Sequence, residues 1–198
     1  MIKAIIFDLN GVFLQAEYLT KRVEKKYGIP GEKLLPILKE VMAIARKPGI
    51  EDSFALWRPK LKKIGFNIDR EEFFNFWFSG EKLVPKLIDY TKKLKERGLK
   101  VFILSNNFKE RTKYYRKNFP EIFSSVDKVY FSWETGFVKP DPKAYLNILR
   151  EQRLRPEECL YFDDSEENIK SAQKLGIRAI KYISFLETKK IIETYLTT

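Results

Sequence analysis

A short apolar run at the N-terminus, ending in an aspartate, restricts the fold of this chain more than any other segment. Residues 2–7 are rich in isoleucine, Asp8 follows them directly, and Gly11 comes three positions later. Continuous apolar runs of this length are typical of parallel strands that are buried on both faces of a sheet. Ligands of such sheets bind just beyond the carboxyl ends of the strands, which is where Asp8 would lie.

The rest of the chain mostly alternates between apolar strands and amphipathic helices. Further strands are predicted at 100–104, 128–132, 159–162 and 177–182, and helices at 84–97, 111–118, 142–149, 165–175 and 188–195. Strands that alternate with helices require right-handed crossovers and predict a parallel sheet with helices on both faces. The expected fold class is therefore α/β, a Rossmann-like doubly wound parallel sheet.

A purely helical stretch interrupts this alternation between about residues 19 and 78. Glycine and proline divide it into four segments, and the last begins at Asp69, a capping-box N-cap with Glu72 three positions later. We therefore predict a core formed by residues 1–15 and 84–198, with a small helical cap domain, residues 16–83, inserted after the first strand. The aromatic cluster at 73–78 would form the core of this cap, unless one or two rings line a pocket or a partner surface.

The composition excludes several kinds of chemistry and partner. The 198 residues include no histidine, so acid–base or metal chemistry must use carboxylates. The formal charge of +11 suits an anionic substrate, although it would also suit nucleic acid. Because the lysines are scattered along predicted helices, solvated helix faces explain most of them, and we expect no nucleic-acid partner.

Cysteine content and hydropathy predict a cytoplasmic protein with no membrane association. The single cysteine, Cys159, has no partner for an intramolecular disulfide, and its place at a strand start suits an inert core residue. No apolar run reaches the length of a bilayer span, and the N-terminus lacks the features of a signal peptide. The sequence leaves the oligomeric state open.

Polar residues of particular kinds gather at four strand ends. They are Asp8 with Asn10, Ser105 with Asn106, Lys139, and Asp163 with Asp164. Each alone is most often a turn, cap or surface residue, and it is their joint occurrence that favours a site. In a doubly wound sheet they would converge, and Mg²⁺ would relieve the repulsion among three carboxylates. A lysine cation and a serine hydroxyl beside them would suit a phosphoryl group next to a nucleophile.

The order and spacing of these motifs resemble those of the haloacid dehalogenase-like (HAD) superfamily. The match consists of Asp8-Leu9-Asn10-Gly11-Val12, Leu104-Ser105-Asn106, Val138-Lys139-Pro140 and Phe162-Asp163-Asp164. It spans nearly the whole chain, and the helical stretch falls where many members carry a cap domain. At a finer level the chain looks similar to small sugar-phosphate phosphatases such as alpha-glucose-1-phosphate phosphatase, and to the phosphatase domain of soluble epoxide hydrolase.

The resemblance implies a magnesium-dependent phosphatase that hydrolyses a small phosphorylated metabolite through an aspartyl-phosphate on Asp8. The implied catalytic residues are Asp8, Asn10, Ser105 and Lys139, and the implied substrate-binding residues are Ser105, Asn106 and Lys139. The implied metal ligands are Asp8, Asn10 through its backbone carbonyl, Asp164, and Asp163 directly or indirectly. The cap residues Arg22, Arg46, Trp57, Arg58 and Trp77 could face the leaving group, but the sequence does not orient their helices.

Asn10 departs from the family pattern, because phosphatases of the family carry there an aspartate that acts as general acid and base. Asparagine donates a hydrogen bond but exchanges no proton, and general acid–base catalysis is typically worth ~100- to 10,000-fold in rate. Three explanations stay open: an introduced change, a natural but slow or specialised phosphatase, or a non-catalytic protein that binds phosphorylated ligands. The family's dehalogenases also lack this aspartate, but they use no magnesium, and the pair Asp163–Asp164 favours a metal.

Overall fold

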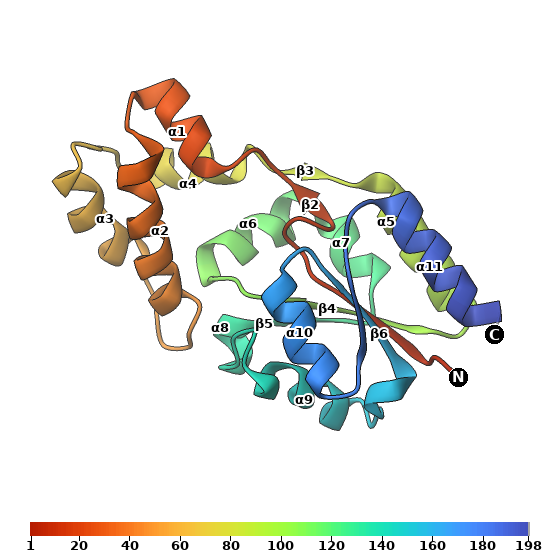
Figure 1. Cartoon of the computed structure of the whole chain (residues 1–198). Coiled ribbons are helices and arrows are strands. Elements are labelled where there is room, and N and C mark those ends of the chain that lie inside the picture. Colours follow the sequence, from red (N-terminus) through yellow and green to blue (C-terminus); the bar gives the residue numbers. More distant parts are fainter. Residues whose placement is uncertain (198) are drawn as a thin grey trace.

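A five-stranded parallel sheet forms the centre of the computed structural model, which describes residues 1–197 (Figure 1). The strands are β1 Ala4–Phe7, β4 Lys100–Ser105, β5 Lys128–Phe131, β6 Cys159–Asp163 and β7 Arg178–Lys181. They lie in the order β5-β4-β1-β6-β7, and each neighbouring pair is parallel. The predicted α/β doubly wound sheet is confirmed, while residue 198, the last of the predicted core, lies outside the described residues.

The central position of β1 follows from its continuous apolar sequence. Ala4 and Ile6 belong to the hydrophobic cluster on one face of the sheet, whereas Ile5 and Phe7 belong to the cluster on the other. Successive side chains of a strand point to opposite faces of the sheet, so a strand that is covered by helices on both faces must be apolar throughout. The pairing of Phe7 with Ile103 brings the carboxyl ends of β1 and β4 to the same edge.

Helices cover both faces of the sheet (Figure 1). One face is covered by α5 Pro85–Glu96, α6 Lys109–Asn118, α7 Pro120–Ser125 and α11 Phe185–Thr197. The other face is covered by α9 Pro142–Glu151 and α10 Glu166–Lys174. The short helix α8 Ser132–Thr135 and the 3-10 helix η1 Pro156–Glu158 lie in connections. None of the helices within residues 1–197 combines the length and the apolar character that a bilayer crossing requires.

Four helices form an insertion after β1, set to one side of the sheet (Figure 1). They are α1 Leu19–Tyr27, α2 Gly31–Ala45, α3 Phe54–Lys63 and α4 Arg70–Phe78. Their facing side chains form a hydrophobic cluster of their own, in which Phe73, Phe74, Trp77 and Phe78 are buried, so the predicted aromatic core is confirmed. Trp77 also lines a cavity, as the alternative allowed for one or two of the rings. Asp69 caps α4 as predicted, accepting a hydrogen bond of 2.8 Å from the backbone N–H of Glu72. The division of the chain into a core and a cap domain stays a prediction.

A two-stranded antiparallel ribbon, not anticipated from the sequence, connects the insertion to the sheet. It pairs β2 Leu14–Gln15 with β3 Lys82–Leu83. Strands of two residues are too short to show a periodic pattern, which is why the sequence indicated only a turn after the first strand. The predicted boundaries after residues 15 and 83 coincide with the ends of these two strands.

One residue that follows β4, Phe108, packs inside the hydrophobic cluster of the insertion. Its ring is fully buried, with its centroid 5.5 Å from that of Trp77 and 5.9 Å from that of Phe78. Phe108 therefore anchors the insertion to the carboxyl edge of the sheet.

We expect Phe108→Ala to lower the free energy of unfolding by about 3–5 kcal/mol, because the residual cavity would lie between the two parts of the molecule. Phe137 is half-buried and packs against the other face of the sheet, so Phe137→Ala is the matched control and should cost clearly less. Urea unfolding of both variants measures the difference. Equal losses would show that Phe108 does not anchor the insertion.

Candidate active site

The carboxyl edge of the sheet brings three predicted residues into direct contact. The Nζ atom of Lys139 lies 2.7 Å from Oδ1 of Asp8 and 2.6 Å from Oδ2 of Asp163. The side chain of Lys139 is only 1% exposed. Burial by itself would lower the pKa of Lys139, but the carboxylates of Asp8 and Asp163 raise it above its ordinary value. The lysine is therefore a fixed cation beside Asp8.

Asn106 fixes the backbone at Lys139 from the neighbouring strand end. Its Oδ1 accepts a hydrogen bond of 2.8 Å from the Lys139 N–H, and its Nδ2 donates one of 2.7 Å to the Lys139 carbonyl. The side chain predicted to bind substrate is thus engaged in positioning the lysine. Its contact with a substrate stays a prediction.

The two acidic residues after β6 are placed differently. Asp163 is fully buried, and its carboxylate accepts hydrogen bonds from Lys139, Tyr161, Asn168 and the backbone N–H of Ser165. Although burial would raise the pKa of Asp163, Lys139 and these donors hold it below its ordinary value. Because protein donors surround this carboxylate, its direct task is to hold Lys139.

Asp164 is exposed, and its carboxylate lies over Gly11. A Cβ atom at Gly11 would come 2.7 Å from Cγ of Asp164, closer than two such atoms can approach. Gly11 also has a φ of +91°, in the region that favours glycine. The glycine is needed both for the turn after β1 and for the space that Asp164 occupies.

The donor set at this edge fits a magnesium ion. Single carboxylate oxygens of Asp8, Asp163 and Asp164 all lie within 4.8 Å of one another. Oxygen ligands of this kind are those that Mg²⁺ prefers. Since protein donors already occupy Asp163, the carboxylates open to an ion are those of Asp8 and Asp164, and the backbone carbonyl of Asn10 follows Asp8 by two residues.

Ser105 places a buried hydroxyl at this edge, and the described residues offer no hydrogen-bond partner for it. The residue ends β4 and is 1% exposed, and its Oγ has no hydrogen-bond partner among residues 1–197. Leaving a buried hydroxyl unpaired costs free energy, which a ligand oxygen would remove.

The side-chain amide of Asn10 is held in one orientation by a chain of hydrogen bonds. The backbone N–H of Phe108 donates to Oδ1 of Asn107 (3.1 Å), so Nδ2 of Asn107 faces Asn10 and donates to its Oδ1 (3.1 Å). Nδ2 of Asn10 in turn donates to the hydroxyl of Tyr115 at 2.7 Å. Since a backbone N–H can only donate, the order of donors and acceptors along this chain is fixed.

Tyr115 lies close to a buried ion pair between Arg111 and Glu81. Burial, together with the nearby Glu81 carboxylate, raises the pKa of Tyr115 well above its ordinary value, so the hydroxyl keeps its proton. Nε of Arg111 donates to Glu81 at 2.8 Å. Both polar groups of the Asn10 amide are therefore engaged, because Oδ1 accepts from Asn107 and Nδ2 donates to Tyr115.

Sequence reasoning missed the partners of Asn10. Asn107 had a signal, because it directly follows the predicted site residues at the end of β4. Tyr115 lies within α6 and Glu81 in the connection between α4 and β3, and neither position follows a pattern that marks a site. The contact of Tyr115 with Asn10, and the place of Glu81 near it, arise only when the helices pack.

A cavity of about 390 Å³ opens beside Asp8, between the strand ends and the insertion. Residues from the sheet edge, including Asp8, Asn10 and Lys139, line one part of it, and Met42 and Arg46 of the insertion line another. Of the other predicted cap residues, Arg22 and Trp77 line a neighbouring cavity with Asn10 and Asp164. Trp57 is buried within the insertion, and Arg58 lines a cavity elsewhere on it.

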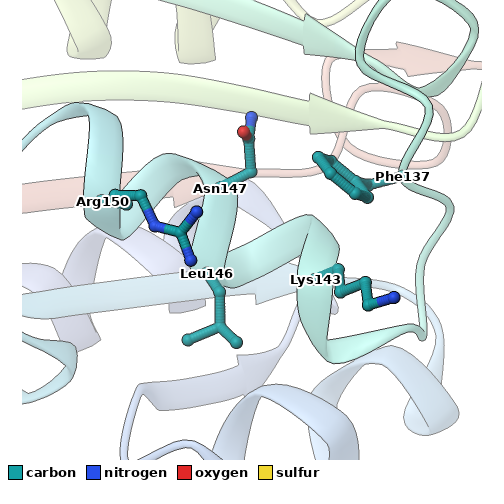
Figure 2. Close-up of a pocket in the computed structure, with 5 residues that line it drawn as sticks. All are labelled: Phe137, Lys143, Leu146, Asn147 and Arg150. Carbon is teal, nitrogen blue, oxygen red and sulfur yellow. The ribbon is translucent and has the colours of Figure 1, made fainter.

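A further cavity, of about 320 Å³, lies against α9 (Figure 2). Phe137 approaches it from the loop before the helix, whereas Lys143, Leu146, Asn147 and Arg150 project from α9 itself. None of the predicted site residues lines this cavity. Of the predicted site residues, Asp8, Asn10, Asn106 and Lys139 line the cavity at Asp8, and Asp164 lines the neighbouring one with Asn10. Neither Ser105 nor Asp163 lines either of these two cavities.

Comparison with known proteins identifies the class to which this fold and site belong. The sequence model of a hydrolase family, the haloacid dehalogenase-like hydrolases, matches residues 2–176. The chain therefore belongs to the haloacid dehalogenase-like hydrolase family, as the motifs indicated.

Relatives and solved structures agree with this assignment. The chain is 25% identical over 187 residues to a putative phosphatase of Bacillus subtilis (91% of this chain, 83% of that protein). It is 24% identical over 199 residues to the bifunctional epoxide hydrolase 2 of Sus scrofa (90% of this chain), of which it spans only 36%. A HAD family enzyme from Bacteroides thetaiotaomicron, solved with magnesium and inorganic phosphate, is 25% identical with a TM-score of 0.79, covering 93% of this chain and 96% of that one.

We expect Gly11→Ala to displace the Asp164 carboxylate and thereby abolish stabilisation by Mg²⁺. Gly98→Ala is the matched control, because Gly98 has a φ of +83° but open space around its Cβ position. Both changes should cost of order 1–3 kcal/mol in backbone strain. Chemical unfolding with and without Mg²⁺ separates the effects: only Gly98→Ala should retain the gain in stability from the ion. A full Mg²⁺ response in Gly11→Ala would contradict the predicted metal position.

Without metal, the ionisation of Asp8 should make stability depend on pH. Burial, with additional repulsion from Asp163 and Asp164, raises the pKa of Asp8 from 3.8 to about 7 despite the nearby Lys139. Between pH 3.8 and about 7, Asp8 is protonated in the folded state but ionised in the unfolded state. The free energy of unfolding therefore falls as the pH rises through this range. Asp8→Asn should have a flatter stability profile across that window, measured by urea unfolding in chelator. Parallel profiles would rule out the shifted pKa.

Proposed function

We propose that this protein is a magnesium-dependent phosphatase that hydrolyses a small phosphorylated metabolite, with Asp8 as the nucleophile. The observation that carries the proposal is the buried Lys139 ammonium between Asp8 and Asp163, with the exposed Asp164 carboxylate beside them. The relatives named as phosphatases, and the related structure solved with magnesium and inorganic phosphate, support it.

The proposed reaction has two displacement steps at phosphorus. Lys139 holds Oδ1 of Asp8, which leaves Oδ2 to attack. A bond forms between Asp8 and phosphorus while the ester P–O bond breaks, and water then displaces Asp8 and releases inorganic phosphate. Lys139 and the unpartnered hydroxyl of Ser105 stabilise the phosphoryl oxygens. Mg²⁺, held by Asp8, Asp164 and the Asn10 carbonyl, would neutralise further negative charge when bound.

Asn10 has a limited task in this scheme. One N–H of its Nδ2 is used by Tyr115, and the second can donate a hydrogen bond to the leaving oxygen, but neither supplies a proton. Such an enzyme suits esters whose leaving groups depart without protonation.

The fixed amide of Asn10 favours a second candidate function. An amide that cannot exchange protons, fixed within a buried hydrogen-bond chain, is also compatible with a protein that binds a phosphorylated ligand without turning it over. Calorimetry with inorganic phosphate and Mg²⁺ would detect such binding. Binding without turnover of any ester would favour this alternative over the phosphatase.

We expect the wild-type protein in Mg²⁺ to hydrolyse an aryl phosphate with an initial burst and an alkyl phosphate very slowly. Asp8→Ala should abolish both activities, because no nucleophile would remain. Asn10→Asp should accelerate the alkyl ester most, by about 100-fold or more, since its leaving oxygen needs a proton. Initial rates of released phosphate on the two esters test these expectations.

Two outcomes would contradict the scheme. Activity retained by Asp8→Ala would exclude Asp8 as the nucleophile. Equal rates of the wild type and Asn10→Asp on the alkyl ester would show that residue 10 lies away from the leaving group, or that another residue supplies the proton. Thermal unfolding of each variant is the control for folding, because Asn10→Asp also alters the hydrogen bond to Tyr115.

A further inference from the structure

The insertion places one arginine in the cavity at Asp8. Arg46 follows α2 directly, and its backbone N–H closes the last turn by donating to the Met42 carbonyl at 3.3 Å. Met42 and Arg46 are four positions apart, so they share a helix face, and both line the cavity. The carboxyl end of a helix favours a positive charge, which suits Arg46 at this place.

Arg46 differs from the other cations of the cavity because no carboxylate neutralises it. Lys139 is paired with Asp8 and Asp163, and Arg111 is paired with Glu81. Within residues 1–197 no carboxylate forms an ion pair with Arg46, and its Nε is buried without a hydrogen-bond partner. A buried guanidinium N–H without an acceptor is costly, so this group has the surroundings of a site that a ligand completes.

The field around Arg46 also favours an anion. Burial and the nearby Arg111 guanidinium lower the pKa of Arg46, and Asp8 only partly opposes them. The guanidinium groups of Arg46 and Arg111 repel each other, and an anion bound beside them would relieve that repulsion. Arg111 already has Glu81 as its partner, which leaves Arg46 as the group to be neutralised.

The geometry of phosphoryl transfer sets which part of a substrate would reach Arg46. The attacking and leaving oxygens lie roughly in line on opposite sides of phosphorus. With Asp8 at the strand ends, the phosphoryl group must lie against the sheet edge, where Ser105 and Lys139 are. The leaving group then points away from the sheet, toward the insertion that carries Arg46.

We propose that Arg46 binds a second anionic group, a carboxylate or a second phosphate, on the leaving group of the substrate. The inference rests on the proposed phosphatase function and specifies its substrate class. The preferred esters would be phosphorylated hydroxy acids or bisphosphates, rather than phosphates of neutral alcohols. A guanidinium donates two parallel hydrogen bonds to a carboxylate or to a phosphate, so both anions would bind Arg46 in the same planar geometry.

The kinetic test compares matched esters in Mg²⁺. The substrates are glycol phosphate with a neutral hydroxyl, phosphoglycolate with a carboxylate, and ethylene glycol bisphosphate with a second phosphate. We expect the wild type to prefer one or both anionic esters in kcat/KM by about 10- to 100-fold, the worth of a charged hydrogen bond. Arg46→Met should lose this preference, mainly through KM, and Arg46→Lys should retain part of it. Arg58→Met is the matched control, because Arg58 is an exposed arginine of the insertion that lines a different cavity.

An equilibrium measurement separates this inference from the function on which it rests. Calorimetry would compare phosphonoacetate with methylphosphonate, neither of which can be hydrolysed at an ester bond. Tighter binding of phosphonoacetate than of methylphosphonate by the wild type, but not by Arg46→Met, would support the inference about Arg46. This holds even if no ester is turned over, because a lack of turnover would overturn only the phosphatase proposal. Turnover without any preference for anionic esters would overturn the Arg46 proposal alone. A uniform loss in Arg46→Met on all three esters would overturn it too, because Arg46 would then contact the transferred phosphoryl group.

Discussion

The buried ammonium of Lys139, held between Asp8 and Asp163, is the interaction on which the organisation of this site depends. Two carboxylates at adjacent strand ends cannot both stay ionised in a buried place without a cation between them. The lysine supplies it, and Asn106 fixes the backbone from which the lysine extends. One ion cluster thus joins β1, β6 and the segment before α9, and it also leaves one oxygen of Asp8 available for chemistry.

The sequence was sufficient to predict the part of the site that lies at strand ends. Asp8 and Asp163 meet because parallel strands deliver their carboxyl ends to one edge. Lys139 reaches them from the segment between α8 and α9, so the structure places it beyond the strand end at which the sequence predicted it. Contacts that depend on packing were not predictable in the same way. Tyr115 stands 105 positions from Asn10, and its hydroxyl reaches the amide only because α6 packs where it does. The β2–β3 ribbon was missed since strands of two residues carry no periodic signal.

Asn10 illustrates how a family motif and its surroundings together define a residue. Compared with the family motif alone, an asparagine looks like the loss of an acid–base group. In the folded chain it belongs to a directional series of donors and acceptors that runs from the Phe108 N–H to the Tyr115 hydroxyl. Both polar groups of this amide are therefore engaged by neighbouring side chains, which a comparison of motifs alone would not reveal.

Phe108 has a consequence for how this protein could be altered, in evolution or by design. Its ring belongs to the core of the insertion, while its backbone N–H fixes the amide of Asn107 and, through it, that of Asn10. A different inserted segment would have to leave space in its own hydrophobic core for this one ring. Changes in the core of the insertion would therefore be felt at Asn10, two positions after Asp8.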